Sequence, residues 1–179
     1  MSDPGKKHAR ASAILGSALF LLVAPGTVVG LVPWWISKWK VQPMPPGFLL
    51  VQLLGILILA QSILLLLEAF TPFALQGLGT PAPVSPTRHL VVTGFYRYVR
   101  NPMYVAVVSA ILGQSMILGN LMLVLYAAFG WLVSHLFVVI YEEPTLRRKF
   151  GDEYAQFCAN VPRWIPRLRS WSGPAGHGQ

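Results

Sequence analysis

A run of 41 residues without a charged side chain, residues 101–141, constrains this chain more than any other feature. At about 1.5 Å per residue, a helix of that length extends roughly 60 Å, twice the ~30 Å thickness of a membrane's hydrocarbon core. Gly119-Asn120, near the middle of the run, is a typical turn sequence. The run therefore predicts a hairpin of two membrane-spanning helices.

Polar clusters stand at both ends of this hairpin. Arg97 and Arg100 precede it, and Glu142-Glu143 follow it. Antiparallel neighbouring helices pack about 8–10 Å apart, so the start of the first helix, near Tyr104, is predicted to lie beside Glu142. The sequence thus indicates a site assembled at one surface of the membrane.

The composition supports an integral membrane protein, because 54% of the residues are hydrophobic and only 11% are charged. Two further charge-free segments, 11–33 and 47–67, are long enough to span a bilayer. The first follows basic residues but is longer than the apolar region of a signal peptide, so we predict a retained helix, bent at Pro25-Gly26. The expected fold is all-α, a polytopic membrane protein with about four transmembrane helices.

The basic residues predict the orientation. In the four-helix topology only Lys38 and Lys40 face the outside, and the positive-inside rule then places both termini in the cytoplasm. Attraction to anionic lipid headgroups accounts for the net charge of +8, so no nucleic-acid partner is needed. The twelve basic residues on the cytoplasmic side are Lys6, Lys7, Arg10, Arg88, Arg97, Arg100, Arg147, Arg148, Lys149, Arg163, Arg167 and Arg169.

The segments outside the membrane differ in character. Residues 1–10 form a basic arm, and residues 71–101, rich in proline and glycine, predict an irregular loop. After the hairpin, apolar residues recur at helical spacing between charged ones, which predicts short amphipathic helices on the membrane surface. These apolar residues are Leu146, Phe150, Tyr154 and Phe157.

Tyrosine and arginine crowd the end of the 71–101 loop. Tyr96, Tyr98 and Tyr104 could stack on a planar base or face a cation, and Asn101-Pro102 predicts a helix start whose free amides can bind a ligand oxygen. The same residues also suit a structural belt of interfacial aromatics and arginines. Both interpretations stay open on these residues alone.

Glu142-Glu143 are a sharper indication of a site. Two adjacent carboxylates at the end of a membrane helix repel each other and oppose the helix dipole, so they require partners. Those partners are nearby arginines or a cationic or hydroxyl-rich ligand, and Glu68 ends the second helix on the same face. His135 is expected to hydrogen-bond a neighbouring helix, and the single Cys158 provides neither a disulfide nor a metal cluster.

Taken together, these motifs resemble the integral membrane methyltransferases that include isoprenylcysteine carboxyl methyltransferase and the phospholipid methyltransferases. The resemblance covers roughly the C-terminal half of the chain. It rests on residues 88–104, on the helical hairpin, on Glu142-Glu-x-x-Leu-x-x-x-Phe-Gly-x-x-Tyr154, and on Val161-Pro-Arg163.

The resemblance implies a pocket for S-adenosyl-L-methionine at the cytoplasmic face, with a lipophilic substrate entering from the bilayer. It implies a single methyltransferase domain over residues 1–179: a basic arm (1–10), two helices (11–70), a cofactor-binding loop (71–101), the hairpin (102–141), a cytoplasmic cap (142–170) and a tail (171–179). The implied cofactor contacts are Arg88, His89, Leu90, Val91, Tyr96, Asn101, Pro102, Met103, Tyr104 and Glu142.

Two positions depart from the family pattern. Asn101 stands where the family has a histidine, and an amide cannot act as a general base. Val138 stands where the eukaryotic carboxyl methyltransferases have an arginine that helps hold the substrate carboxylate. If the acceptor needs a base, the candidates are Glu142, Glu143, Glu68 and His89, and the sequence does not choose among them.

The expected function is S-adenosyl-L-methionine-dependent methyl transfer, without a metal, to a lipophilic acceptor. The acceptor group is a carboxylate, or an amine, hydroxyl or thiol of a lipid-like molecule. Membrane sterol reductases share a similar C-terminal region, so an NADPH-dependent reductase is one alternative. A non-enzymatic membrane carrier or assembly protein is the other.

Overall fold

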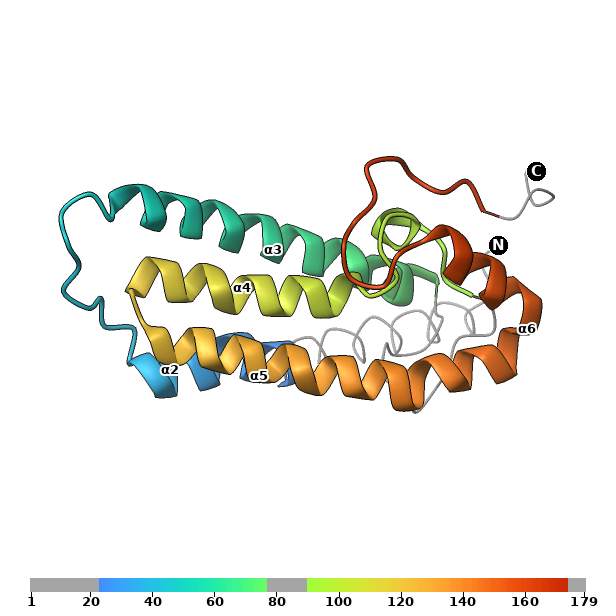
Figure 1. The fold of residues 1–179 in the computed structure, drawn as a ribbon, viewed down its shortest axis with the longest axis horizontal. Helices are drawn as coiled ribbons and strands as arrows, with labels where there is room; N and C mark the ends of the chain where they lie inside the picture. The colour runs from blue at the N-terminus through green and yellow to red at the C-terminus, as the bar shows by residue number, and fades with distance from the viewer. Residues whose placement is uncertain (1–22, 77–89, 174–179) are drawn as a thin grey trace, which may run out of the picture.

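The computed structural model of this chain describes residues 23–76 and 90–173 (Figure 1). Every regular element in these two ranges is a helix, which confirms the all-α prediction. Several predicted features lie outside the described residues: the basic arm, most of the first predicted helix, the part of the loop that holds Arg88 and His89, and the end of the tail.

The described chain contains four longer helices and several short helical segments. The longer helices are α3 (Leu49–Gln76), α4 (Pro102–Leu118), α5 (Leu121–Phe137) and α6 (Glu143–Asn160). The short segments are η1 (Gly26–Leu31) and η3 (Val138–Glu142), both with π-helical hydrogen bonding, the 3₁₀ turn η2 (Gly94–Arg97), and α2 (Val32–Ser37).

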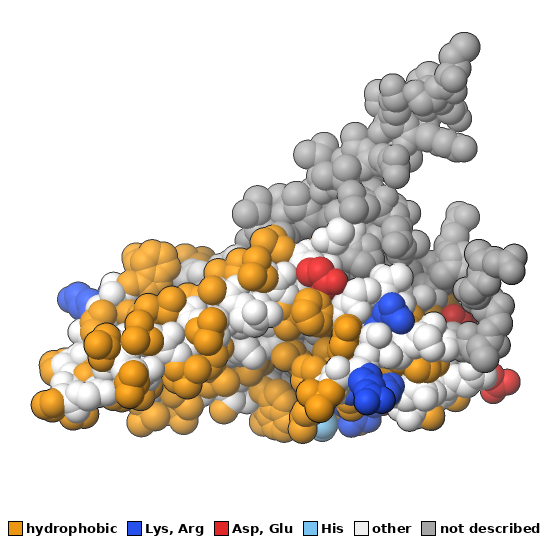
Figure 2. Space-filling model, turned by 90° about the horizontal axis from the view of Figure 1, so that it is seen from above, with side chains coloured by type: hydrophobic (Ala, Val, Ile, Leu, Met, Phe, Trp, Pro, Cys, Tyr) orange, Lys and Arg blue, Asp and Glu red, His pale blue; other side chains and the backbone are white. Residues whose placement is uncertain are grey.

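The helices lie lengthwise beside one another, and the irregular segments gather at one end. In Figure 1, α3, α4 and α5 run along the long axis, while η2, α6 and the C-terminal segment meet at the right. Figure 2 shows hydrophobic side chains over the body and most charged side chains at that same end. Exposed apolar residues such as Leu50, Leu57 and Ile140 suit contact with lipid, and this arrangement is that of an integral multi-pass membrane protein.

The closest helix contact joins α3 to α4 through two glycines. A Cβ atom on Gly55 would lie 2.8 Å from the Gly113 carbonyl oxygen, and one on Gly113 would lie 2.8 Å from the Gly55 oxygen. Ala106 and Ala110 on α4 are also buried. Small residues let helix backbones approach closely in a membrane.

The predicted hairpin turn is confirmed. Gly119 ends α4 in the left-handed conformation with φ 63°, which glycine adopts without steric penalty. Asn120 then caps α5, because its side-chain oxygen accepts a hydrogen bond of 3.0 Å from the Met122 amide. Hence two adjacent residues reverse the chain between the two helices.

The predicted bend near Pro25 takes the form of the π-helical segment η1. Pro25 itself keeps helical dihedral angles, and the irregular hydrogen bonding starts at Gly26. Carbonyl groups in this segment accept side-chain hydrogen bonds from other helices: Gln114 donates to the Val29 oxygen at 2.8 Å and Tyr126 to the Val28 oxygen at 3.1 Å. These bonds satisfy backbone groups that the altered helix leaves available.

Two helix ends differ from the sequence prediction. α3 does not end at Glu68 but continues to Gln76. The chain after the hairpin also stays helical through Glu142-Glu143, from α5 through η3 into α6, and it bends only at Gly151, where φ is 50°. Glu142 and Glu143 therefore lie inside a continuous helical segment and not at its C-terminal end, so the expected conflict with a helix dipole does not arise.

Candidate functional site

The hairpin brings Tyr104 and Glu142 together, as the antiparallel arrangement predicted. Tyr104 lies in the first turn of α4 and Glu142 ends η3. The Tyr104 hydroxyl donates a hydrogen bond of 3.3 Å to Oε2 of Glu142. Residues 38 positions apart in sequence thus share one contact at the end of the bundle where charged side chains gather.

Tyr96 and Glu68 complete an oxygen-rich cluster with Tyr104 and Glu142. Burial raises the pKa of the Tyr96 phenol, and the nearby charges of Glu142 and Glu68 raise it further, so Tyr96 stays a neutral hydrogen-bonding group. The turn that carries Tyr96 begins at Gly94, which has φ 53° and contacts the Glu68 carboxylate so closely that a Cβ atom would collide with it. Oε2 of Glu68 is buried and has no hydrogen-bond partner among the described residues.

Glu143, next to Glu142, faces a different environment. Arg163 contacts its carboxylate through both oxygens, at 2.7 and 3.0 Å, and Arg100 contacts Oε1 at 3.1 Å. The side chains of Arg100 and Glu143 are 11% and 8% exposed, so this is a largely buried charge cluster. Arg100 also reaches the sulfur of Cys158 at 2.8 Å. The cluster fixes α6 and the following segment against the start of α4.

Asn101 has a structural partner in the same region. Its side-chain amide donates a hydrogen bond of 3.1 Å to the Arg163 carbonyl oxygen, and the Arg100 backbone amide donates to the Pro162 oxygen at 2.9 Å. These two bonds hold residues 161–163 against the entry of α4. Pro102 then occupies the first turn of α4, where its missing N–H leaves no helical bond unmade.

Aromatic side chains form a wall beside Tyr104. Trp164 packs edge-on against Tyr104, with ring centroids 6.4 Å apart, and its indole N–H donates to Nδ1 of His135 at 3.1 Å. The His135 ring stacks on Trp131 at 5.3 Å. His135 is therefore a packing residue, but its hydrogen-bond partner lies in the irregular segment after α6, whereas the sequence predicted a partner on a neighbouring helix. Sequence reasoning did not identify Trp164 as part of this region, although its place between two prolines in Val161-Pro-Arg-Trp-Ile-Pro166 indicates a fixed, ordered turn.

The C-terminal segment and α6 pack against the end of the loop that precedes α4. The Arg97 guanidinium donates to the Trp171 carbonyl oxygen at 2.6 Å, and the Trp171 amide donates back to the Arg97 oxygen at 3.0 Å. Trp171 stacks on Phe157. Leu90 and Val92 pack against the same buried cluster, whose members are Tyr154, Phe157 and Val161. The amphipathic helix thus buries its apolar face against the loop.

Most of the predicted contact residues meet at this end of the molecule. Tyr96, Tyr104 and Glu142 form one cluster, and Asn101-Pro102 form the adjoining helix entry. Met103 follows in the first turn of α4, while Leu90 joins the packed cluster beside it and Val91 is half-buried next in the chain. Arg88 and His89 lie outside the described residues.

The charges of this cluster favour a cationic ligand group. Glu142 and Glu68 contribute carboxylates, the Tyr104 phenol binds Glu142, and the Tyr96 phenol lies near both carboxylates. Arg100 and Arg163 bind Glu143, and Arg97 binds the Trp171 carbonyl, although the buried Nε of Arg100 has no hydrogen-bond partner among the described residues. Carboxylates together with aromatic faces attract a positive charge, and more strongly so where water is partly excluded.

The fold and this cluster define a helical membrane protein with acidic and aromatic side chains gathered at one end of its bundle. The sequence pattern of the phospholipid methyltransferase family matches residues 50–153, more than half of the chain, and the chain belongs to this family. It is also similar to the protein-S-isoprenylcysteine O-methyltransferase of Schizosaccharomyces pombe, with 40% identity over 87 residues. That match covers 45% of this chain and 34% of the relative, so the chain corresponds to about a third of the relative's length.

Proposed function

We propose that this protein transfers a methyl group from S-adenosyl-L-methionine to a lipophilic acceptor at the membrane surface. Members of its family use this methyl donor. The observation that carries the proposal is the contact of Tyr104 with Glu142, beside Tyr96. This contact brings together the loop, the hairpin entry and the glutamate pair, which are three separate parts of the sequence motif.

The residues of the pocket fit this donor. When bound, S-adenosyl-L-methionine supplies an electrophilic methyl group on a positively charged sulfur. The Glu142 carboxylate offers an opposite charge, and Tyr104 orients it through the hydrogen bond of 3.3 Å. The rings of Tyr96 and Tyr104 offer π faces for a cation or a planar base. In this proposal, Asn101, Pro102 and Met103 contribute the free amides of the α4 entry.

The remaining parts of the proposal follow from the motif and the topology. Leu90 and Val91, with Arg88 and His89 before them, line the donor site from the loop. The cap, residues 142–170, closes it on the cytoplasmic face, where both termini also lie. The acceptor enters from the bilayer and carries a carboxylate, amine, hydroxyl or thiol, and anionic headgroups surround the basic end.

The rate enhancement in such a site comes mainly from positioning and from exclusion of water. The transfer is an in-line displacement, so holding the acceptor atom in line with the methyl group removes most of the entropic barrier. The buried cluster of Glu143 with Arg100 and Arg163 fixes the cap over the helix entry and thereby limits access of water. These side chains support the pocket and do not touch the reacting atoms in this proposal.

Titration calorimetry with S-adenosylhomocysteine tests the proposal. The detergent-solubilised wild type is expected to bind it saturably, and Glu142→Ala and Tyr104→Ala are expected to lose that binding. Glu153→Ala, a change on the exposed face of α6, is the matched control and should bind like the wild type. Binding of NADPH in place of S-adenosylhomocysteine would support a reductase, and a folded protein that binds neither would support a non-enzymatic role.

A further inference from the structure

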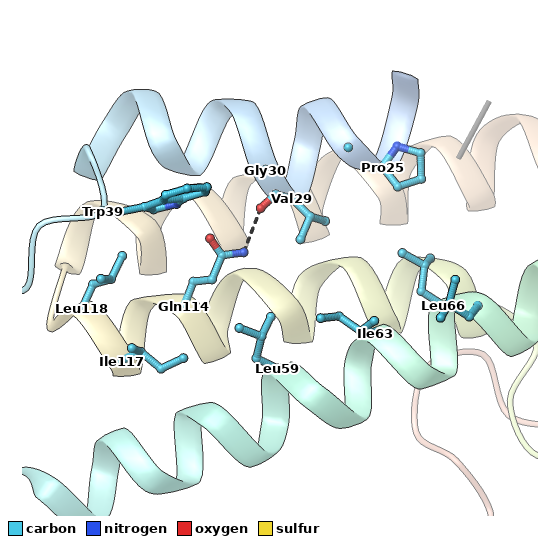
Figure 3. Close-up of a pocket in the computed structure, with 12 residues that line it drawn as sticks. Pro25, Val29, Gly30, Trp39, Leu59, Ile63, Leu66, Gln114, Ile117 and Leu118 are labelled. Atoms are coloured by element: carbon cyan, nitrogen blue, oxygen red, sulfur yellow. Dashed lines mark hydrogen bonds between the residues drawn. The ribbon is translucent and has the colours of Figure 1, made fainter. Parts of the chain in front are cut away.

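An apolar groove lies on the body of the bundle, between η1, α3 and α4 (Figure 3). It encloses about 510 Å³, within the range of about 300–1,000 Å³ that is typical of small-molecule sites. Its lining is almost entirely apolar, and the amide nitrogen of Gln114 already donates a hydrogen bond of 2.8 Å to the Val29 oxygen. The part of a ligand that lies inside this groove is therefore a hydrocarbon.

The groove follows the helix axes over roughly 25 Å. This length runs from Leu118 on α4 to Leu67 on α3, counted at about 1.5 Å per residue through the close pairing of Gly113 with Gly55. One leaflet of a hydrocarbon core about 30 Å thick is roughly 15 Å deep, so the groove is long enough for a whole acyl chain. A helix about 10 Å across and equally long occupies far more than the volume of the groove, so the occupant is a lipid tail and not a second protein helix.

The groove also carries charge at one end. Trp39 and Leu118 line this end, and the exposed side chains of Lys38 and Lys40 flank Trp39 in the chain. These two lysines are the only charged residues between positions 23 and 67, and neither pairs with a carboxylate among the described residues. Surrounding lipid is as apolar as the groove, so the head of a lipid determines its selectivity, and two unneutralised lysines favour an anionic head.

The backbone holds Trp39 and its neighbouring lysines in place. Lys38 and Trp39 both have left-handed dihedral angles, with φ 49° and 52°, which is uncommon for residues other than glycine. The buried Ser37 fixes this turn, because its Oγ accepts from the Trp39 amide and its carbonyl oxygen accepts from the Lys40 amide, both at 3.0 Å. The Lys38 ammonium lies 4.3 Å from the centroid of the Trp34 ring, a contact that orients the side chain without neutralising its charge.

We propose that this groove binds one acyl chain of an anionic phospholipid, whose phosphate lies at Lys38 and Lys40. This lipid is a bound structural lipid and not the methyl acceptor, because its head lies at the end of the bundle opposite the contact of Tyr104 with Glu142. The site is therefore independent of the proposed methyl transfer. A zwitterionic phospholipid brings a positive group to the same lysines and gains less from them.

Titration with matched phospholipids, followed by native mass spectrometry, tests the charged end of the site. The delipidated full chain in detergent is expected to bind phosphatidylglycerol about tenfold more tightly than phosphatidylcholine with the same acyl chains. Lys38→Gln combined with Lys40→Gln should reduce this preference to about twofold or less, because the attraction of both lysines is lost. Arg147→Gln combined with Arg148→Gln removes two exposed positive charges on α6 and should preserve it.

Three results of this titration would overturn the proposal. The first is equal affinity of the wild type for the two lipids. The second is a preference that survives in the lysine variant or disappears in the arginine variant, since the anionic head would then lie elsewhere. The third is displacement of phosphatidylglycerol by sn-glycerol 3-phosphate, which has the head without a tail and is expected not to compete.

A further pair of variants tests the groove itself. Ile63 lines the groove, so Ile63→Trp fills it and is expected to weaken binding of both phospholipids by about tenfold through steric overlap with the tail. Leu57→Trp, on an exposed part of α3 outside the groove, is the matched control and should bind both lipids like the wild type. Circular dichroism establishes that both variants are folded before the titration. Unchanged lipid binding in folded Ile63→Trp would show that the tail does not occupy the groove.

Discussion

Two adjacent glutamates in this protein occupy opposite environments. Glu143 is held by two arginines in a largely buried cluster, whereas Glu142 has a tyrosine hydroxyl as its hydrogen-bond partner. A fully paired carboxylate stabilises structure, and its charge is not available to a ligand. Glu142 is oriented by a phenol and has no ion-pair partner among the described residues, and burial raises the pKa of its carboxyl group. The comparison teaches that one glutamate pair can serve both purposes, because successive side chains on a helix point about 100° apart.

The largest expected effect is on the structural member of the pair. Glu143→Ala leaves Arg100 and Arg163 without their shared partner and should lower the free energy of unfolding by about 3–5 kcal/mol, since an uncompensated charge remains in a largely buried place. Thermal unfolding in detergent, followed by circular dichroism, measures this change. If Glu143→Ala unfolds at the wild-type temperature, the cluster does not hold the cap.

A change at Glu142 is expected to affect ligand affinity and not stability. Glu142→Gln removes the charge but preserves the shape, and affinity for S-adenosylhomocysteine should fall about tenfold while affinity for a positively charged sulfonium analogue falls about a hundredfold. The unfolding temperature should change little, because Glu142 makes no ion pair among the described residues. Equal losses for the neutral and the charged ligand would show that Glu142 does not recognise the sulfonium charge.

A change at Asn101 also tests the stabilising contacts, and its expected effect on stability is smaller than that of Glu143→Ala. Asn101→Ala removes the hydrogen bond to the Arg163 carbonyl oxygen and should reduce stability by about 1–2 kcal/mol, the usual effect of leaving a buried polar group unpaired. Hydrogen exchange of residues 161–171 should increase in the same variant. Unchanged protection there would indicate that Asn101 does not anchor this segment, and the variant would then report on ligand binding alone.

The smallest expected effect concerns the hydrogen bond between the two sides of the hairpin. Tyr104→Phe keeps the ring and its edge contact with Trp164 but removes the bond of 3.3 Å to Glu142. Affinity for S-adenosylhomocysteine should fall about three- to tenfold, which corresponds to one ordinary hydrogen bond of about 1 kcal/mol. Calorimetry compares this variant with Tyr98→Phe, a change of the same kind at a tyrosine whose ring packs against Phe95.

Much of this architecture could be predicted from sequence because the responsible signals are local or periodic. The charge-free run required membrane helices, Gly119-Asn120 required a turn, and the antiparallel hairpin then required Tyr104 to lie near Glu142. The cofactor contacts themselves remain predictions. Gly55 was missed, since one glycine in a long apolar helix does not show which helix it faces. The continuation of α3 past Glu68 was missed because proline and glycine in the following segment favoured a loop.

The sequence by itself determined the helical class, the membrane spans and the end of the bundle where the polar motifs meet. These follow from hydrophobicity and helix length, which depend only on residue order. The tertiary structure alone decided which glutamate pairs with arginine, where Glu68 lies, and that an apolar groove forms between η1, α3 and α4. Those features depend on contacts between helices far apart in sequence, and such contacts are selected by packing geometry and by the pairing of buried polar groups.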